Sequence, residues 1–169
     1  MTSDRSRIVV TGMGAMTPLG QTSDAFWANL VAGKPGIGPM TLCDPTDYPC
    51  RIAGEVRDFD PAEYMDNKES RRMARFSQLA VAAGLTAVES AGLDISRENP
   101  YRVGVVLGNG NGGFPTLEDN CRVLAERGGM RMTPFFFPMV LPNMAAANVS
   151  RFVGAHGYNA TATTACASS

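Results

Sequence analysis

An uninterrupted apolar run, followed at once by a cluster of glycines, constrains the fold of this chain more than any other feature. The run is Val103-Gly104-Val105-Val106-Leu107, and the cluster is Gly108-Asn109-Gly110-Asn111-Gly112-Gly113. A strand without polar alternation is typical of a parallel sheet that is covered on both faces. Parallel strands need a crossover connection, which is usually a helix. The sequence therefore predicts an α/β fold built around parallel strands.

Further strands and helices alternate along the sequence. Runs rich in β-branched or apolar residues predict additional strands over residues 7–11, 51–55 and 158–164. Apolar spacings of three and four, with capping residues, predict helices over residues 22–32, 68–91, 115–127 and 142–152. The stretch from 33 to 60 carries too many prolines and glycines for long elements, so we expect an ordered surface loop there. Alternating strands and helices favour a layered α/β domain.

Charge and hydropathy exclude several classes of function. Fifteen Lys and Arg side chains balance sixteen Asp and Glu side chains, which gives a formal net charge of −1. This balance removes the electrostatic argument for a nucleic-acid partner. No apolar run approaches the roughly 18 residues of a membrane span, and the N-terminal residues do not form a signal-peptide core. We therefore expect a cytoplasmic protein with no nucleic-acid and no membrane partner.

The residues that could bind a metal ion are poorly spaced for that purpose. The four cysteines are Cys43, Cys50, Cys121 and Cys166, and the single histidine is His156. None of these spacings is typical of a zinc site, so the sequence predicts no metal centre. Without an export signal, reduced thiols are expected. His156 is expected in a surface loop before the last predicted strand, and Cys166 at the far end of that strand, so the two residues should lie roughly 20 Å or more apart.

The glycine cluster permits a second interpretation. Gly108, Gly110 and Gly113 match the G-x-G-x-x-G spacing of dinucleotide-binding turns directly after a strand. Against this, Phe114-Pro115 stands where the helix that binds a pyrophosphate should begin. The competing explanation is steric, because glycines allow sharp turns and close approach of another group to the backbone. A nucleotide-binding domain therefore stays open as an alternative.

The strongest catalytic candidate is Cys166, at the end of the last predicted strand. Its neighbours in Thr164-Ala165-Cys166-Ala167-Ser168 are all small, which leaves room for a substrate. If a helix begins at the cysteine, its unpaired amides would stabilise both a thiolate and a developing oxyanion. The residue type alone also permits a buried structural cysteine.

Several segments together, in order along essentially the whole chain, resemble the β-ketoacyl-acyl carrier protein synthases, most closely the type II enzymes. The segments are Arg7-Ile8-Val9-Val10-Thr11-Gly12-Met13-Gly14, Phe26-Trp27, Asp58-Phe59-Asp60-Pro61, Arg71-Arg72-Met73, Gly108-Asn109-Gly110 and Thr164-Ala165-Cys166-Ala167-Ser168. The resemblance implies a thiolase-like layered sandwich of two similar halves, with a mostly parallel mixed sheet. Residues 1–169 would form the N-terminal half. The C-terminal half, with the histidines and lysine of the synthases, would be absent from this chain.

The resemblance also implies a reaction. It is the decarboxylative Claisen condensation of an acyl-enzyme thioester with malonyl-acyl carrier protein in fatty acid elongation, without a cofactor. Cys166 would be the acyl-accepting nucleophile. Asn111 falls at an acyl-pocket position that commonly holds isoleucine, so the preferred chain length is in doubt. Phe135, Phe136 and Phe137 match a segment that walls the acyl pocket of the partner subunit in a homodimer, although ordinary core aromatics are the competing explanation.

A cluster of basic residues suggests a binding site for the acidic carrier protein. Lys68, Arg71, Arg72 and Arg75 are spaced so that they would lie along one side of a helix start. By resemblance, Lys68, Arg71, Arg72 and Arg131 occupy carrier-binding positions, and complementary charge would guide docking. Residue types alone would favour a solvated helix face instead.

Three other functions remain open at this point. One is a ketosynthase of polyketide assembly, which this half of the sequence does not separate from a fatty-acid enzyme. Another is a non-catalytic, ketosynthase-like interaction subunit, which commonly lacks the cysteine, so Cys166 argues against it. The third is the nucleotide-binding domain. We also expect these 169 residues alone to fold poorly and to be inactive in condensation.

Overall fold

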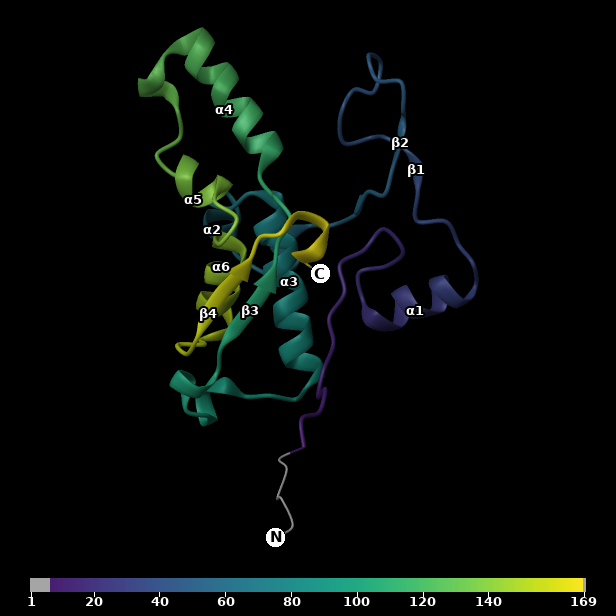
Figure 1. Cartoon of the computed structure of the whole chain (residues 1–169), viewed down its shortest axis with the longest axis vertical. Coiled ribbons are helices and arrows are strands. Elements are labelled where there is room, and N and C mark those ends of the chain that lie inside the picture. Colours follow the sequence, from purple (N-terminus) through teal and green to yellow (C-terminus); the bar gives the residue numbers. More distant parts are fainter. Residues whose placement is uncertain (1–6, 169) are drawn as a thin grey trace.

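Short strands and helices alternate along the chain (Figure 1). The computed structural model describes residues 7–168. Its α-helices are α1 (Ser23–Val31), α2 (Asn67–Ser70), α3 (Arg75–Ser90), α4 (Phe114–Arg127), α5 (Phe136–Val140) and α6 (Met144–Val153). Its strands are β1 (Gly38–Pro39), β2 (Ile52–Ala53), β3 (Val105–Gly108) and β4 (Asn159–Ala162). Single 3-10 turns are η1 (Pro61–Glu63), η2 (Ile95–Arg97), η3 (Pro100–Arg102), η4 (Gly129–Arg131) and η5 (Ala165–Ser168).

A parallel strand pair packed on two helices forms the centre of the structure. β3 and β4 pair in parallel, with Val105 opposite Asn159. Helix α6 contacts both strands and packs along α3 (Figure 1). The predicted α/β class with a parallel sheet is therefore confirmed. The antiparallel pair β1–β2 forms a separate small sheet in the loop region.

Small side chains allow the two central helices to approach closely. Ala82 of α3 and Ala146 of α6 are fully buried, and Val81 is the largest side chain without exposure. A Cβ atom at Gly84 would lie 2.9 Å from Cγ1 of Val149, so the two backbones meet at a position without a side chain. The expectation that small residues permit tight packing of this helix is confirmed.

The helix predicted over residues 68–91 is interrupted. α2 ends at Ser70, and α3 begins only at Arg75. Between them Met73 and Ala74 are buried, and the Gln78 amide donates to the Ser70 carbonyl at 2.8 Å. A glutamine side chain thus takes a carbonyl that a continuous helix would use for its own backbone. The predicted single basic helix face is therefore wrong, because the interruption separates Arg75 from the other basic residues.

The strand predicted over residues 7–11 does not form. Residues 7–11 form no strand, and Ile8 is 98% exposed. This segment continues into Gly12 and Gly14, where added Cβ atoms would lie 2.4 Å and 2.2 Å from carbonyl oxygens of α3. The segment therefore approaches a helix rather than a strand edge. The predicted strand β3 does form, and within residues 7–168 one of its faces is open, since Val106 is 73% exposed.

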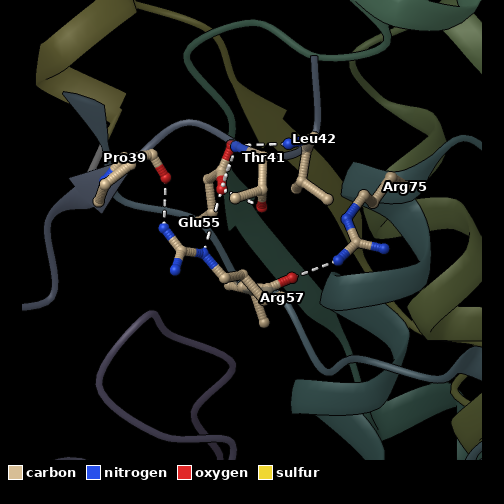
Figure 2. A network of polar contacts seen from close by, with 7 residues as sticks. Pro39, Thr41, Leu42, Glu55, Arg57 and Arg75 are labelled. Atoms are coloured by element: carbon tan, nitrogen blue, oxygen red, sulfur yellow. Dashed lines mark hydrogen bonds and ion pairs between the residues drawn. The ribbon is translucent and has the colours of Figure 1, made fainter. Parts of the chain in front are cut away.

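The loop from residue 33 to residue 60 is held together by one carboxylate (Figure 2). Glu55 accepts hydrogen bonds from the backbone amides of Thr41 and Leu42, and its side chain is only 7% exposed. Arg57 donates to Glu55 at 3.2 Å. The amides of Leu42 and Thr41 hold the pKa of Glu55 at about 2, well below its usual value. Arg75 donates to the Val56 carbonyl and so fastens the loop to α3.

The predicted strand over 51–55 shortens to β2 because Glu55 turns toward these amides instead of continuing a ladder. The other predicted elements appear with small shifts in their bounds. Thr22 caps α1 by accepting a hydrogen bond from the Ala25 amide at 3.1 Å. Within residues 7–168 no helix has both the length and the apolar character that a membrane span requires.

Candidate active site

Cys166 lies in an exposed turn directly after β4. The turn is η5, and the Cys166 side chain is exposed, so the alternative of a buried structural cysteine is wrong. The Thr164 amide donates to Oγ of Ser168 at 2.8 Å, and the Ala167 amide donates to the Thr164 carbonyl at 3.1 Å. These bonds close a single tight turn. Within residues 7–168 the thiol is therefore accessible from solvent.

The predicted helix start at Cys166 appears as a 3-10 turn that begins one residue earlier, at Ala165. Ala165 has a φ of 52°, and among residues 7–168 it is the non-glycine residue with a positive φ. A left-handed backbone conformation is sterically unfavourable for residues with a side chain, and the energy cost is smaller for alanine than for a β-branched residue. The sharp change of direction after β4 thus depends on this strained residue next to the thiol.

The glycine cluster makes room for the cysteine turn. A Cβ atom at Gly108 would lie 1.5 Å from the Ser168 carbonyl oxygen, and one at Gly110 would lie 3.2 Å from the Ala165 oxygen. The steric explanation of these glycines is therefore confirmed, because the group that approaches their backbone is the chain's own turn. The space that a pyrophosphate would need beside Gly108 is occupied, so the structure gives the nucleotide-binding alternative no support.

Asn109 is a structural link that no motif in the sequence predicted. Its backbone amide donates to the Ala162 carbonyl at 2.9 Å, at the end of β4. Its side-chain amide donates to the Pro142 carbonyl at 2.8 Å, just before α6. One residue therefore ties the strand that leads to the cysteine turn to the segment that follows α5. The sequence held one indication of this role. Asn109 stands between two glycines, where a polar side chain has few local partners and must bond to a more distant segment.

The residues predicted to line an acyl pocket lie on two elements. Asn111 is exposed, and its side-chain oxygen accepts a hydrogen bond from the Gly112 amide at 2.9 Å. Phe136 is half-buried on α5, whereas Phe137 is 68% exposed. Their rings meet edge to face with centroids 5.3 Å apart. Phe137 is therefore not a core aromatic, which removes the competing explanation for that residue.

The predicted carrier-binding residues differ in how freely they are displayed. Lys68 and Arg71 are exposed on and just after α2, and Arg131 is exposed in η4. Arg72 is half-buried, with its guanidinium carbon 4.8 Å from the centre of the Phe135 ring. Arg75 lies over Phe59 at 5.4 Å. The structure thus brings Lys68 and Arg71 together as solvent-facing cations, while Arg72 and Arg75 also serve internal contacts.

The remaining cysteines and the histidine occupy surface positions. All four cysteines have free thiols and are exposed. His156 is exposed in the loop before β4 and meets Tyr101 edge to face at 5.7 Å, so the predicted surface-loop position is confirmed. Among residues 7–168 no three His, Cys, Asp or Glu side chains gather in a way that could hold a metal ion.

Comparison with known proteins places these features in a family. Residues 5–169 match the family model "Beta-ketoacyl synthase, N-terminal domain". A curated relative from Synechocystis sp., 3-oxoacyl-[acyl-carrier-protein] synthase 2, is 43% identical over 164 residues, which cover 97% of this chain and 39% of the relative. This chain therefore spans about two fifths of the length of that relative.

Solved structures of similar fold agree with the sequence match. The ishigamide ketosynthase/chain length factor has a TM-score of 0.81 and 26% identity, with 92% of this chain and 39% of that chain covered. A type II PKS acyl-carrier protein in complex with its ketosynthase bound to the hexaketide, AntDE:AntF, has a TM-score of 0.76 and 26% identity, with 96% and 42% covered. The α/β fold described above is thus similar to that of the corresponding part of these ketosynthases.

Proposed function

This chain belongs to the β-ketoacyl synthase family, and from that premise we propose that the protein carrying it elongates fatty acids by decarboxylative Claisen condensation. We assign these residues to the N-terminal half of a thiolase-like layered sandwich. The 39% coverage of the curated relative supports this division, with the other half supplied by further chain. The observation that carries the proposal is the exposed Cys166 in a tight turn that the glycine cluster accommodates.

In the proposed first step the Cys166 thiolate attacks the carbonyl carbon of an acyl-carrier thioester. The acyl group moves to the cysteine sulfur, and the carrier thiolate leaves and takes up a proton. The exchange replaces one thioester by another, so it is nearly isoenergetic. The backbone amide of Cys166 would donate to the developing oxyanion. A second amide and the histidines of the reaction would come from the C-terminal half.

In the proposed second step malonyl-carrier protein loses carbon dioxide and leaves a carbanion. The carbanion attacks the acyl carbon, a carbon–carbon bond forms, and the Cys166 thiolate is released. Loss of carbon dioxide drives the bond formation. All electrons come from the carboxylate that departs, so no redox cofactor is needed.

The acyl carrier protein is the proposed macromolecular partner. Lys68 and Arg71 are exposed cations on one short segment, and Arg72 and Arg131 add to the same proposed surface. The solved complex of a related ketosynthase with an acyl-carrier protein supports this kind of partner. Such a basic surface would attract an acidic carrier by electrostatic steering.

We also propose a homodimer in which α5 presents Phe136 and Phe137 to the acyl pocket of the partner subunit, with Asn111 lining the pocket. The 68% exposure of Phe137 supports this, because exposed aromatic rings are typical of an interface. A cytoplasmic location fits four free, exposed thiols, since oxidising compartments favour disulfides.

A ketosynthase of polyketide assembly is the second candidate. The similarity of this chain's fold to the ishigamide and AntDE:AntF ketosynthases, each 26% identical in sequence, favours this candidate. The identity of 43% to the 3-oxoacyl-[acyl-carrier-protein] synthase 2 favours the fatty-acid enzyme. An interaction subunit without catalysis is disfavoured because Cys166 is present and accessible.

A condensation assay on the protein with both halves tests the proposal. Cys166→Ser is expected to lower the rate of 3-oxoacyl-carrier formation by at least about a thousand-fold, as expected when a covalent nucleophile is lost. The control Cys121→Ser changes another exposed thiol and is expected to leave the rate unchanged. Equal rates for Cys166→Ser and the unmodified protein would refute the proposed function. A single round of condensation rather than repeated, unreduced rounds would favour the fatty-acid enzyme over the polyketide one.

A further inference from the structure

Helix α5 is fixed at both ends by residues outside the proposed catalytic steps. At its start, the Phe135 ring lies 4.8 Å from the Arg72 guanidinium carbon. Beyond its end, the Asn109 amide holds the Pro142 carbonyl at 2.8 Å. Between these points a Cβ atom at Gly113 would lie 3.1 Å from Cα of Val140. The position of α5 therefore depends on the basic segment at one end and on the glycine cluster at the other.

Arg72 is directed toward α5 by a shared carboxylate. Glu69 pairs with Arg72 at 3.7 Å and with Arg151 of α6 at 2.5 Å. Its side chain is 23% exposed, so solvent screens these pairs less than it screens a fully exposed pair. Two arginines from different elements thus meet at one carboxylate, and the Arg72 guanidinium is held over Phe135. Helix α5 also contacts α6 (Figure 1).

We propose that Arg72 is a positioning residue that holds α5, and with it Phe136 and Phe137, in place. The significance for acyl binding rests on the proposed function, whereas the packing role of Arg72 does not. Arg71 differs from Arg72 in this respect, since its side chain makes no hydrogen bond or ion pair within residues 7–168. Arg72 therefore affects how acyl chains are accommodated even when no carrier protein takes part.

Hydrogen exchange on the protein with both halves tests the packing role. The reporters are the Met139 and Leu141 amides, which bond to the Phe135 and Phe137 carbonyls. Arg72→Met is expected to accelerate their exchange about two- to five-fold, the factor that a partly exposed cation–π contact provides. Phe135→Leu is expected to have the same effect, and the double variant is expected to add little. Arg72→Lys keeps a cation over the ring and should restore part of the protection.

The matched control for exchange is Arg71→Met, which removes an equal charge from the adjacent, exposed position and is expected to leave both amides unchanged. Unchanged exchange in Arg72→Met, or equal acceleration in Arg71→Met, would overturn the positioning role.

Acylation by acyl-CoA donors tests the consequence without any carrier protein. Arg72→Met is expected to change the ratio of rates with hexadecanoyl-CoA and hexanoyl-CoA by about two- to five-fold, while Arg71→Met preserves the ratio. If Arg72→Met preserves the ratio and raises only the KM for acyl carrier protein, Arg72 acts in docking alone and the inference is wrong. If no donor acylates the unmodified protein, the proposed function fails, and the exchange experiment still decides the packing role.

Discussion

Gly108 shows how strongly one missing methyl group constrains the site. The Ser168 carbonyl oxygen occupies the place where a Cβ atom would stand, so the cysteine turn can form only beside a residue without a side chain. The motif Thr164-Ala165-Cys166-Ala167-Ser168 identified the candidate nucleophile from sequence alone. The reason for the nearby glycines could not be derived in the same way, because the two segments meet only in the folded chain.

A glycine substitution tests this steric relation. Gly108→Ala is expected to destabilise the protein by about 1–3 kcal/mol, the usual cost of overpacking a closed site, and to lower acylation of Cys166. Gly129→Ala is the control, because a Cβ there would meet only Cδ1 of Leu124 at 3.7 Å. Thermal unfolding and acylation rates provide the measurements. A Gly108→Ala protein as stable and as reactive as the control would contradict the steric account.

At the scale of elements, the spacing of apolar residues predicted where helices form, but it did not predict where a helix is interrupted. The spacing of apolar residues over 115–127 and 142–152 corresponds closely to α4 and α6. The interruption between α2 and α3 was not predicted, because Met73 and Ala74 preserve the apolar pattern while the Gln78 side chain takes a backbone carbonyl. The strand predicted over 7–11 failed for another reason, since a strand forms only beside a partner.

The β1–β2 loop is expected to depend on pH through Glu55. Its folded-state pKa of about 2 lies below the ordinary 4.5, so its stabilising effect is complete above pH 4.5 and is lost as the pH falls through 2. Amide exchange of Thr41 and Leu42 is expected to accelerate across this interval. Glu55→Gln should remove the pH dependence, while Glu126→Gln, at an exposed position, should retain it. Protection of both amides that stays constant down to pH 2 would rule out this role of Glu55.

The short α2 segment is expected to guide carrier docking through Arg71. Arg71→Glu should raise the KM for acyl carrier protein by about ten-fold at low salt and by less at high salt, because exposed charges are screened. Rates with acyl-CoA should stay the same. Arg102→Glu makes the same change in charge at an exposed position on η3 and is the control. An equal loss with carrier and CoA donors would exclude a docking role for Arg71.

At the scale of the whole molecule, exposed apolar surface indicates where further chain or a partner packs. Val106 on β3, Trp27 on α1 and Val10 near the N-terminus are each more than half exposed. Soluble proteins rarely leave so many large apolar side chains in water. The sequence predicted that one sheet face would need cover from a second half, and the exposure of Val106 agrees with that expectation. The sequence of residues 1–169 could not predict which side chains cover this surface, because the covering side chains belong to other residues.

The most direct test of the account is to find which cysteine accepts an acyl group. The protein with both halves is incubated with an acyl-carrier thioester, and its peptides are analysed by mass spectrometry. All four thiols are exposed within residues 7–168, so each of them is a possible acceptor. We predict a single acyl group on the peptide that contains Cys166. Acylation of Cys43, Cys50 or Cys121 instead, or of none of the four, would contradict the central claim.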